Sequence, residues 1–455
     1  MRFGARWMVV AAALGAAAGC GGSSDTGGTS TTSAGGTGGT GGTTTSASTG
    51  GGGTGGTGGT GGTGGGTVGG PFTSAGAASY EAQTAVAASA DGKSVVVSWI
   101  GFFADNTSAI GYAISRDAGA TFTPPAYVSA PGGRLSSNPV IAADGQGRFF
   151  LAWLGFRVDS TGPDEHVYLS RLDVGASAFG APVPASDDGV STTRDFDKPS
   201  IAVDANDNVL LTWADFTSSA APVLTFARSP EGATFNRTTI ASGNDFGNLA
   251  YLCLDAAAGP SAPLHVAHLA IGATIVVHRS ADQGKTWTPT PVPATNVVFQ
   301  NPTCVAHGND VWVAFASGMA APSPSMNAPG DAVAVSRSSD GGLGYAAPVS
   351  VTGPPGTPRY LFPQLARGAT GPLEVVYYAG TEGAPAALTR ASSMDGASWS
   401  TAKIGDAGTF TLDRTLASWL GDYLGLAAAG GQSFVSFTEN TKNKAHIGFL
   451  EVPAP

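Results

Sequence analysis

Four arginines occupy similar places along the chain, each a few residues before a short apolar segment. They are Arg134, Arg194, Arg359 and Arg414. Because a guanidinium presents a planar fork of donors, arginine can bind a carboxylate through two parallel hydrogen bonds. Arranged around one axis, the four side chains would suit an anionic sugar or a peptide carboxylate. The alternative is that each arginine pairs with a nearby aspartate, such as Asp195 or Asp413, in a structural network.

A second group has the residue types that glycoside hydrolysis requires. SWLGDYLGLA (418–427) places Asp422 beside Tyr423, and RDFDKPSIAVD (194–204) contains Asp197 and Lys198. In a hydrolase, Tyr423 would be the nucleophile once a carboxylate accepts its proton, and Asp422 and Asp197 would supply acid or base catalysis. The alternative, which we favour, is structural: the aspartates bind backbone groups or Lys198, and Tyr423 packs against its surroundings.

Histidines and acidic residues do not form a pattern typical of a metal site. The six histidines are scattered, with no transition-metal spacing. DANDN (204–208) could hold calcium, but a hairpin turn explains it more simply. We predict no metal and no cofactor. A net charge of −10, with 12% charged residues, also argues against a basic patch for nucleic acid.

The first 20 residues have the features of a signal peptide. Arg2 and Arg6 precede an apolar run that ends in AAAGC. Small residues before Cys20 resemble a bacterial lipobox, although Ala17 stands where leucine is usual. The resemblance implies a lipid on Cys20 and a place in the bacterial cell envelope. Gly21 is not the aspartate that retains lipoproteins at an inner membrane, so we favour the outer membrane or cell surface. An ordinary secretory signal is the alternative.

Residues 21–70 consist almost entirely of glycine, threonine and serine. Such a segment has too few apolar residues to offset its chain entropy, so we expect a disordered tether. Its root-mean-square length is about 40 Å, from ~5–6 Å times the square root of the residue number. Residues 71–455 are rich in apolar residues, and we expect them to fold as a monomeric domain.

One turn motif recurs along this domain. SRDAGATF (115–122) and SADQGKTW (280–287) share Ser-x-Asp-x-Gly-x-Thr before an aromatic residue, and degraded copies begin at residues 170, 229, 338 and 393. Each copy lies between two apolar runs, which predicts a strand, a turn and a strand. The motif aspartates are expected to accept backbone N–H groups within the turn. The residues assigned to this structural role are Asp117, Asp282, Asp340 and Asp395.

A second repeat precedes the turn motif. NPVIAADGQGRFFLAWLG (138–155) is one of seven related segments along the chain, and each predicts two strands around a tight turn. Seven three-strand units, six of them with a fourth strand, predict an all-β propeller of four-stranded antiparallel blades. Residues 68–74 would then supply the outer strand of the last blade and close the ring. A six-bladed ring is the alternative.

The turn motif resembles the Asp box of sialidase-like propellers, also called the BNR repeat. The resemblance covers about residues 75–452 and implies a β-propeller whose Asp boxes lie opposite the active site. Its functional implication is weaker, because Asp boxes also occur in non-catalytic propellers. A sialidase is expected to have an Arg-Ile-Pro stretch and a glutamate beside its tyrosine nucleophile. This sequence has no Arg-Ile-Pro and no convincing glutamate.

Two functions therefore stay open. Loops opposite the Asp boxes hold most of the charge of the domain, including Lys198, Asp164, His166 and Asp215. We expect a non-enzymatic propeller that recognises a glycan or protein ligand through this face, with the four arginines and Lys198 as ligand-binding residues. The alternative is an exo-acting, retaining glycoside hydrolase of sialidase-like design, with a tyrosine nucleophile.

The two cysteines of the domain lie in equivalent strands of neighbouring repeats. Aligning the repeats places Cys253 and Cys304 one residue out of register, so they face opposite sides of their strands. We therefore expect two separately buried thiols. A disulfide is the alternative.

Overall fold

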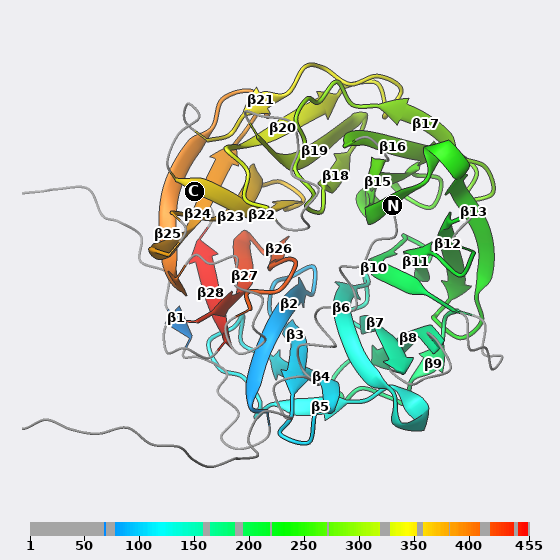
Figure 1. Ribbon diagram of the computed structural model, residues 1–455, viewed down its shortest axis with the longest axis vertical. Coiled ribbons are helices and arrows are strands. Elements are labelled where there is room, and N and C mark those ends of the chain that lie inside the picture. Colours follow the sequence, from blue (N-terminus) through cyan, green and yellow to red (C-terminus); the bar gives the residue numbers. More distant parts are fainter. Residues whose placement is uncertain are drawn as a thin grey trace, which may run out of the picture.

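The computed structural model describes residues 68–69, 78–157, 164–186, 194–218, 221–270, 273–318, 328–352, 358–381, 383–409, 419–440 and 445–453. Its strands form seven four-stranded antiparallel sheets, arranged as blades of a ring (Figure 1). The predicted seven-bladed β-propeller is confirmed, and the six-bladed alternative is wrong. Helical structure in the described ranges is limited to three 3₁₀ turns, at Pro131–Gly133, Gly243–Asp245 and Ala256–Ala258. None of the described helices is long and apolar enough to cross a membrane.

The first four blades run outward from the central axis in chain order. Blade 1 consists of β2 (Tyr80–Ala88), β3 (Val95–Phe102), β4 (Ser108–Ser115) and β5 (Ala126–Val128). Blade 2 consists of β6 (Leu135–Ala143), β7 (Phe149–Arg157), β8 (Asp164–Leu172) and β9 (Val183–Pro184). Blade 3 consists of β10 (Phe196–Val203), β11 (Asn208–Asp215), β12 (Val223–Pro230) and β13 (Asn236–Ser242). Blade 4 consists of β14 (Gly247–Leu254), β15 (Leu264–Ala270), β16 (Thr274–Ser280) and β17 (Thr288–Pro291).

The last three blades include the closure of the ring. Blade 5 consists of β18 (Thr303–His307), β19 (Asp310–Ser317), β20 (Ala332–Ser338) and β21 (Val349–Ser350). Blade 6 consists of β22 (Arg359–Arg367), β23 (Leu373–Gly380), β24 (Pro385–Ser393) and β25 (Ser400–Thr409). Blade 7 combines β26 (Gly425–Ala429), β27 (Gln432–Glu439) and β28 (His446–Pro453) with β1 (Val68–Gly69). Val68 pairs with Leu450, so the N-terminal segment supplies the outer strand, as predicted.

The apolar core lies between the blades. The second strand of each blade is buried on both faces, which explains its continuous apolar sequence. Most buried clusters combine neighbouring blades: Val97 of blade 1, for example, shares a cluster with Phe434 of blade 7. Each second strand also carries one buried aromatic side chain at an equivalent place. These residues are Trp99, Trp153, Trp213, His268, Phe315, Tyr377 and Phe437.

The turns with the repeated Ser and Asp join the third and fourth strands. In the first of them, Asp117 accepts hydrogen bonds from the Thr121 backbone N–H at 2.8 Å and from its hydroxyl at 2.5 Å. The backbone N–H of Gly119 donates to Ser115 Oγ at 2.8 Å, and the positive φ of 89° at this residue favours glycine. Asp282, Asp340 and Asp395 also accept backbone N–H groups in their turns.

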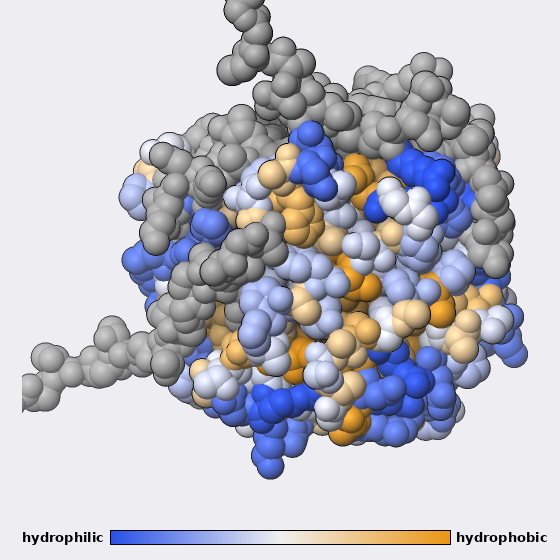
Figure 2. Space-filling view, turned by 90° about the horizontal axis from the view of Figure 1, so that it is seen from below, coloured by the Kyte–Doolittle hydropathy of each residue, from blue (hydrophilic) through white to orange (hydrophobic). Residues whose placement is uncertain are grey.

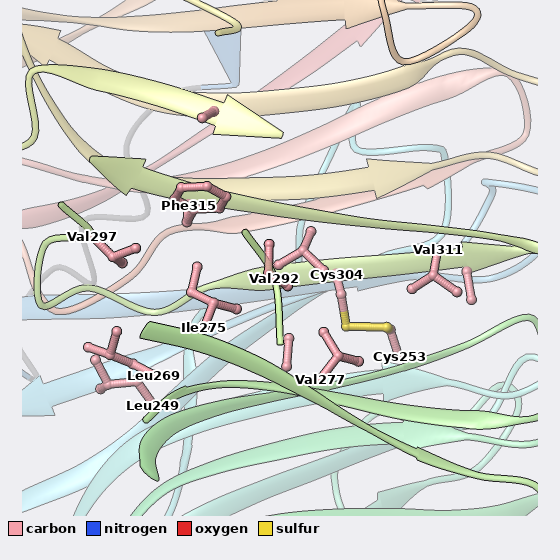
Figure 3. Packing of buried hydrophobic residues seen from close by; sticks show 14 residues of the cluster. Leu249, Cys253, Leu269, Ile275, Val277, Val292, Val297, Cys304, Val311 and Phe315 are labelled. Carbon is pink, nitrogen blue, oxygen red and sulfur yellow. A yellow bond between two sulfur atoms is a disulfide. The ribbon is translucent and has the colours of Figure 1, made fainter. Parts of the chain in front are cut away.

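The expectation of two separate thiols is wrong, because Cys253 and Cys304 form a disulfide (Figure 3). Their Cα atoms are 5.7 Å apart. Cys253 lies in β14 of blade 4 and Cys304 in β18 of blade 5. Consecutive blades stack face to face, so the near face of one meets the opposite face of the next. Residues that point to opposite sides of equivalent strands are therefore the ones that meet.

Candidate functional site

Five of the seven inner strands contain a β-bulge near their beginning. At each bulge the register shifts and one non-glycine residue has a positive φ. These residues are Gln83, Asn138, Lys198, Leu249 and Phe362, with φ from 50° to 59°. Such a conformation costs about 1–3 kcal/mol and persists only where surrounding contacts impose it. The inner strands lie closest to the axis (Figure 1), so the bulges bring polar side chains of different blades together there.

A chain of hydrogen bonds connects these bulges around the axis. Gln83 Nε2 donates to Asn138 Oδ1 at 3.0 Å, and Asn138 Nδ2 donates to Asp197 Oδ1 at 3.1 Å. Asn248 Nδ2 lies 3.4 Å from Asp197 Oδ2. Gln83, Asn138 and Asp197 are buried. We call these four residues, together with Lys198, Asp422 and Tyr423, the axial network.

The positive charge of the axial network is paired inside the protein. Lys198 donates from Nζ to Asp422 Oδ2, and the side chains are only 4% and 12% exposed. Lys198 comes from blade 3 and Asp422 lies three residues before β26 of blade 7, so the ion pair connects non-adjacent blades. The ammonium also lies 5.9 Å from the centre of the Tyr423 ring. A ligand that bound Lys198 would have to displace the carboxylate of Asp422, which is only 12% exposed.

The hydroxyl of Tyr423 is also committed to the protein. It donates to the backbone carbonyl of Pro139 at 3.0 Å, and the residue is buried. Burial raises the pKa of Tyr423 well above its usual value; the charges of Asp422 and Asp197 raise it further, and a hydrogen bond from Gln83 lowers it. A nucleophilic phenol needs a carboxylate or another base to accept its proton. Here the phenol proton of Tyr423 is donated to the Pro139 carbonyl instead.

A second cluster lies between blades 2 and 3. Arg134 donates to Asp164 at 2.6 Å, and His166 Nε2 is 3.1 Å from Asp164 Oδ1. The same ring nitrogen lies 3.4 Å from an Arg134 nitrogen and 3.5 Å from Arg194 Nη1. Burial lowers the pKa of His166, as does the charge of Arg134, whereas Asp164 raises it. The imidazole is therefore neutral at pH 7, and we call these four residues the arginine–histidine cluster.

A groove lies beside this cluster on blade 3. Its volume is about 420 Å³, within the range of about 300–1,000 Å³ typical of small-molecule sites. All four strands of blade 3 contribute to its lining, and Ser186 completes it from the adjacent blade. We call it the blade-3 groove. Its lining includes Arg194, Phe196, Trp213, Asp215, Arg237 and Thr239.

The structure brings the predicted site residues together in separate groups. Asp197, Lys198, Asp422 and Tyr423 meet in the axial network, and Arg134 and Arg194 meet at His166. Arg359 lies elsewhere, 3.1 Å from Asp331 and hydrogen-bonded to the carbonyl of Pro329 at 2.6 Å. Arg414 and Cys20 lie outside the described residues.

Sequence reasoning missed two organising residues, Gln83 and Asn138. Asn138-Pro139 occupies the same repeat position as Lys198-Pro199, and Gln83 occupies that position in the first repeat. Aligning the repeats at this position would have identified both residues. Arg237 was missed as well, because it lies on an outer strand, away from the loops that carry most of the charge.

Comparisons with known proteins find similarity in structure alone. No protein-family description and no curated protein sequence matches the chain. A lectin from Burkholderia pseudomallei matches with a TM-score of 0.56 and 12% identity, over 83% of this chain and 97% of that one. A sialidase from Trypanosoma rangeli matches at 0.49 and 11%, over 82% and 53%; the chain spans about half its length. A protein of unknown function from Dyadobacter fermentans matches at 0.48 and 15%, over 83% and 95%. At these identities the likeness shows the propeller fold alone.

Proposed function

We propose that the protein is a non-catalytic glycan-binding propeller, anchored to the bacterial cell envelope through a lipid on Cys20. The observation that carries this proposal is the blade-3 groove, which is lined by two arginines, an aspartate and several hydroxyl side chains. Mixed donors and acceptors in a groove of this size suit the hydroxyl groups of a sugar.

The axial network argues against a hydrolase. Lys198 and Asp422 neutralise each other, and the Tyr423 hydroxyl donates to a backbone carbonyl. Of the predicted arginines, Arg134 pairs with Asp164 and Arg359 with Asp331. These side chains serve different partners rather than one site for a substrate carboxylate.

A glycan suits the surface better than an apolar protein partner. Apolar residues are scattered among hydrophilic ones on the side of the molecule in Figure 2. Across the described residues, the large hydrophobic side chains that are exposed are Val174, Leu343, Val349 and Met394, and they belong to three blades. Large apolar patches usually mark docking sites for proteins. The lectin from Burkholderia pseudomallei is an example of glycan recognition on this fold.

A glycan array tests the proposal directly. The full-length protein, purified in detergent, should bind a subset of immobilised glycans above the level of its heat-denatured form. No binding to any glycan would overturn the proposal. A Cys20→Ser variant should lose palmitate labelling in cells and the membrane association that we expect from the lipid. Unchanged labelling would refute the anchor.

A sialidase-like hydrolase is the second candidate, because Asp197, Asp422 and Tyr423 do lie in one network. The test is hydrolysis of fluorogenic sialosides and a panel of neutral glycosides by the wild-type protein and Tyr423→Phe. We expect no turnover by either protein. Turnover by the wild type that is lost in Tyr423→Phe would establish the hydrolase instead.

A further inference from the structure

We propose that the blade-3 groove selects saccharides that carry a carboxylate, and that Arg237 binds this group. The inference rests on the proposed glycan-binding function and adds the chemical class of the ligand. It starts from charge: the lining contains Arg194, Arg237 and Asp215, a formal excess of one positive charge, on a chain whose net charge is −10. A locally positive charge on an acidic protein favours the binding of an anionic saccharide over a neutral one.

Arg237 is the cation that this groove leaves available. It lies in β13, the outermost strand of blade 3, and is exposed. Its Nη1 makes one long hydrogen bond of 3.4 Å, to the carbonyl of Ala185 across the seam between blades 2 and 3. Among the described residues it forms no ion pair. Its position therefore keeps the planar donor fork free for a carboxylate.

Arg194 contributes to the same groove in a different way. The residue is only 8% exposed, and its Nη1 lies 3.5 Å from His166 in the arginine–histidine cluster. Since its guanidinium is held inside the protein, it supplies a fixed positive potential at the inner end of the groove. Arg237, at the outer end, supplies the contact.

Asp215 explains why the anion should be a sugar acid with a single carboxylate on each sugar. Its Oδ1 accepts the backbone N–H of Thr217 at 2.9 Å, and within the described part of the chain Asp215 forms no ion pair. Its second oxygen can accept sugar hydroxyls, and Thr239 adds a hydroxyl nearby. Asp215 would repel a phosphate dianion more strongly than the single carboxylate of a sugar acid, and the sugar acid also presents hydroxyls that Asp215 can bind.

Titration calorimetry on the full-length protein tests this assignment. The probes are tetragalacturonic acid and sialyllactose, which carry the carboxylate on different sugars, together with a sulfated disaccharide and neutral cellotetraose. Arg237→Gln removes the charge at nearly constant length, and Arg237→Lys keeps the charge without the fork. Arg116→Gln is the matched control, since Arg116 is exposed, lies in blade 1 and binds Ser94 and the Ala176 carbonyl.

We expect at least one carboxylated probe to bind. Arg237→Gln should weaken it about tenfold or more, Arg237→Lys less, and Arg116→Gln not at all. Equal binding of a carboxylated probe by wild type and Arg237→Gln would overturn the groove assignment but leave glycan binding intact. Binding of only the sulfated or neutral probe would overturn the ligand class. If none of these probes binds although glycans bind on the array, the ligand class is wrong. If no probe binds here and no glycan binds on the array, both proposals are wrong.

Discussion

Residues of the axial network bind one another within the protein. Lys198 and Asp422 form an ion pair that is almost fully buried. Replacing both partners of such a pair by apolar residues often costs little, whereas removing one of them leaves a buried charge and costs about 3–5 kcal/mol. The pair therefore fixes how blades 3 and 7 meet at the axis, which is a structural role.

A double-mutant cycle measures this role. Lys198→Met should lower the free energy of unfolding by about 3–5 kcal/mol, because the Asp422 carboxylate loses its ammonium partner. Lys198→Met combined with Asp422→Leu should regain part of the loss. Urea unfolding of the four proteins gives the interaction energy. Additive effects of the two substitutions would contradict the coupling.

Tyr423 offers a finer test at the same scale. Tyr423→Phe removes the hydroxyl that donates to the Pro139 carbonyl, and should lower the free energy of unfolding by about 1–2 kcal/mol because a buried acceptor is left unsatisfied. Tyr345→Phe is the control, since the Tyr345 hydroxyl is buried without a hydrogen-bond partner among the described residues. Denaturant unfolding should show no loss for the control. Equal losses in both variants would mean that the Pro139 bond contributes nothing.

At the scale of elements, blade 4 carries an acid-sensitive pair. His268 and His278 are buried and stack with their ring centres 4.9 Å apart. Burial lowers the pKa of His268 to about 3, with a further decrease from His278, and lowers that of His278 to about 4 against the opposing charge of Asp245. Both rings are therefore neutral in the folded protein, whereas the unfolded chain takes up protons below pH 6.5.

The stability from these histidines is thus complete above pH 6.5 and is lost as the pH falls towards 4 and then 3. Between pH 7 and pH 5, each of the two histidines should lower the free energy of unfolding by about 2 kcal/mol. His268→Phe places at this position the kind of ring that other blades have, and should remove its share of the loss. Urea unfolding at pH 7, 6 and 5 measures it. If His268→Phe followed the wild-type pH dependence, the assignment would be wrong.

The disulfide acts between elements rather than within one. Cys253 and Cys304 are separated by 51 residues, and a closed loop of this size stabilises the folded state by about 4 kcal/mol in the chain-entropy description. Cys253→Ala with Cys304→Ala should lower the unfolding free energy by up to this amount, and a reducing agent should then have no further effect. An oxidised wild type no more stable than the double variant would show that the bridge adds nothing.

For the whole molecule, the sequence predicts repeated features better than contacts between repeats. Seven blades follow from seven copies of a strand pair. Each copy is recognised from residues that are close together in the sequence, such as those around Trp99 and Trp153. The disulfide was missed because Cys253 and Cys304 meet only through the stacking of two blades. Asp197, Lys198 and Tyr423 were singled out by type, but their partners Asn138 and Pro139 depend on how the bulges face the axis.

Closure of the ring depends on a very short strand, β1. β1 contributes two residues to blade 7, and Val68 pairs with Leu450 just before the predicted domain boundary at residue 71. Without it, β28 becomes an exposed edge strand, which invites pairing with another chain. A protein beginning at residue 71 should therefore exchange the backbone amides of His446–Pro453 faster, and aggregate more, than one beginning at residue 61. Hydrogen-exchange mass spectrometry and size-exclusion chromatography compare the two. If exchange and elution matched, the N-terminal strand would not be what closes the propeller, and blades 1 and 7 would hold the ring through their shared core alone.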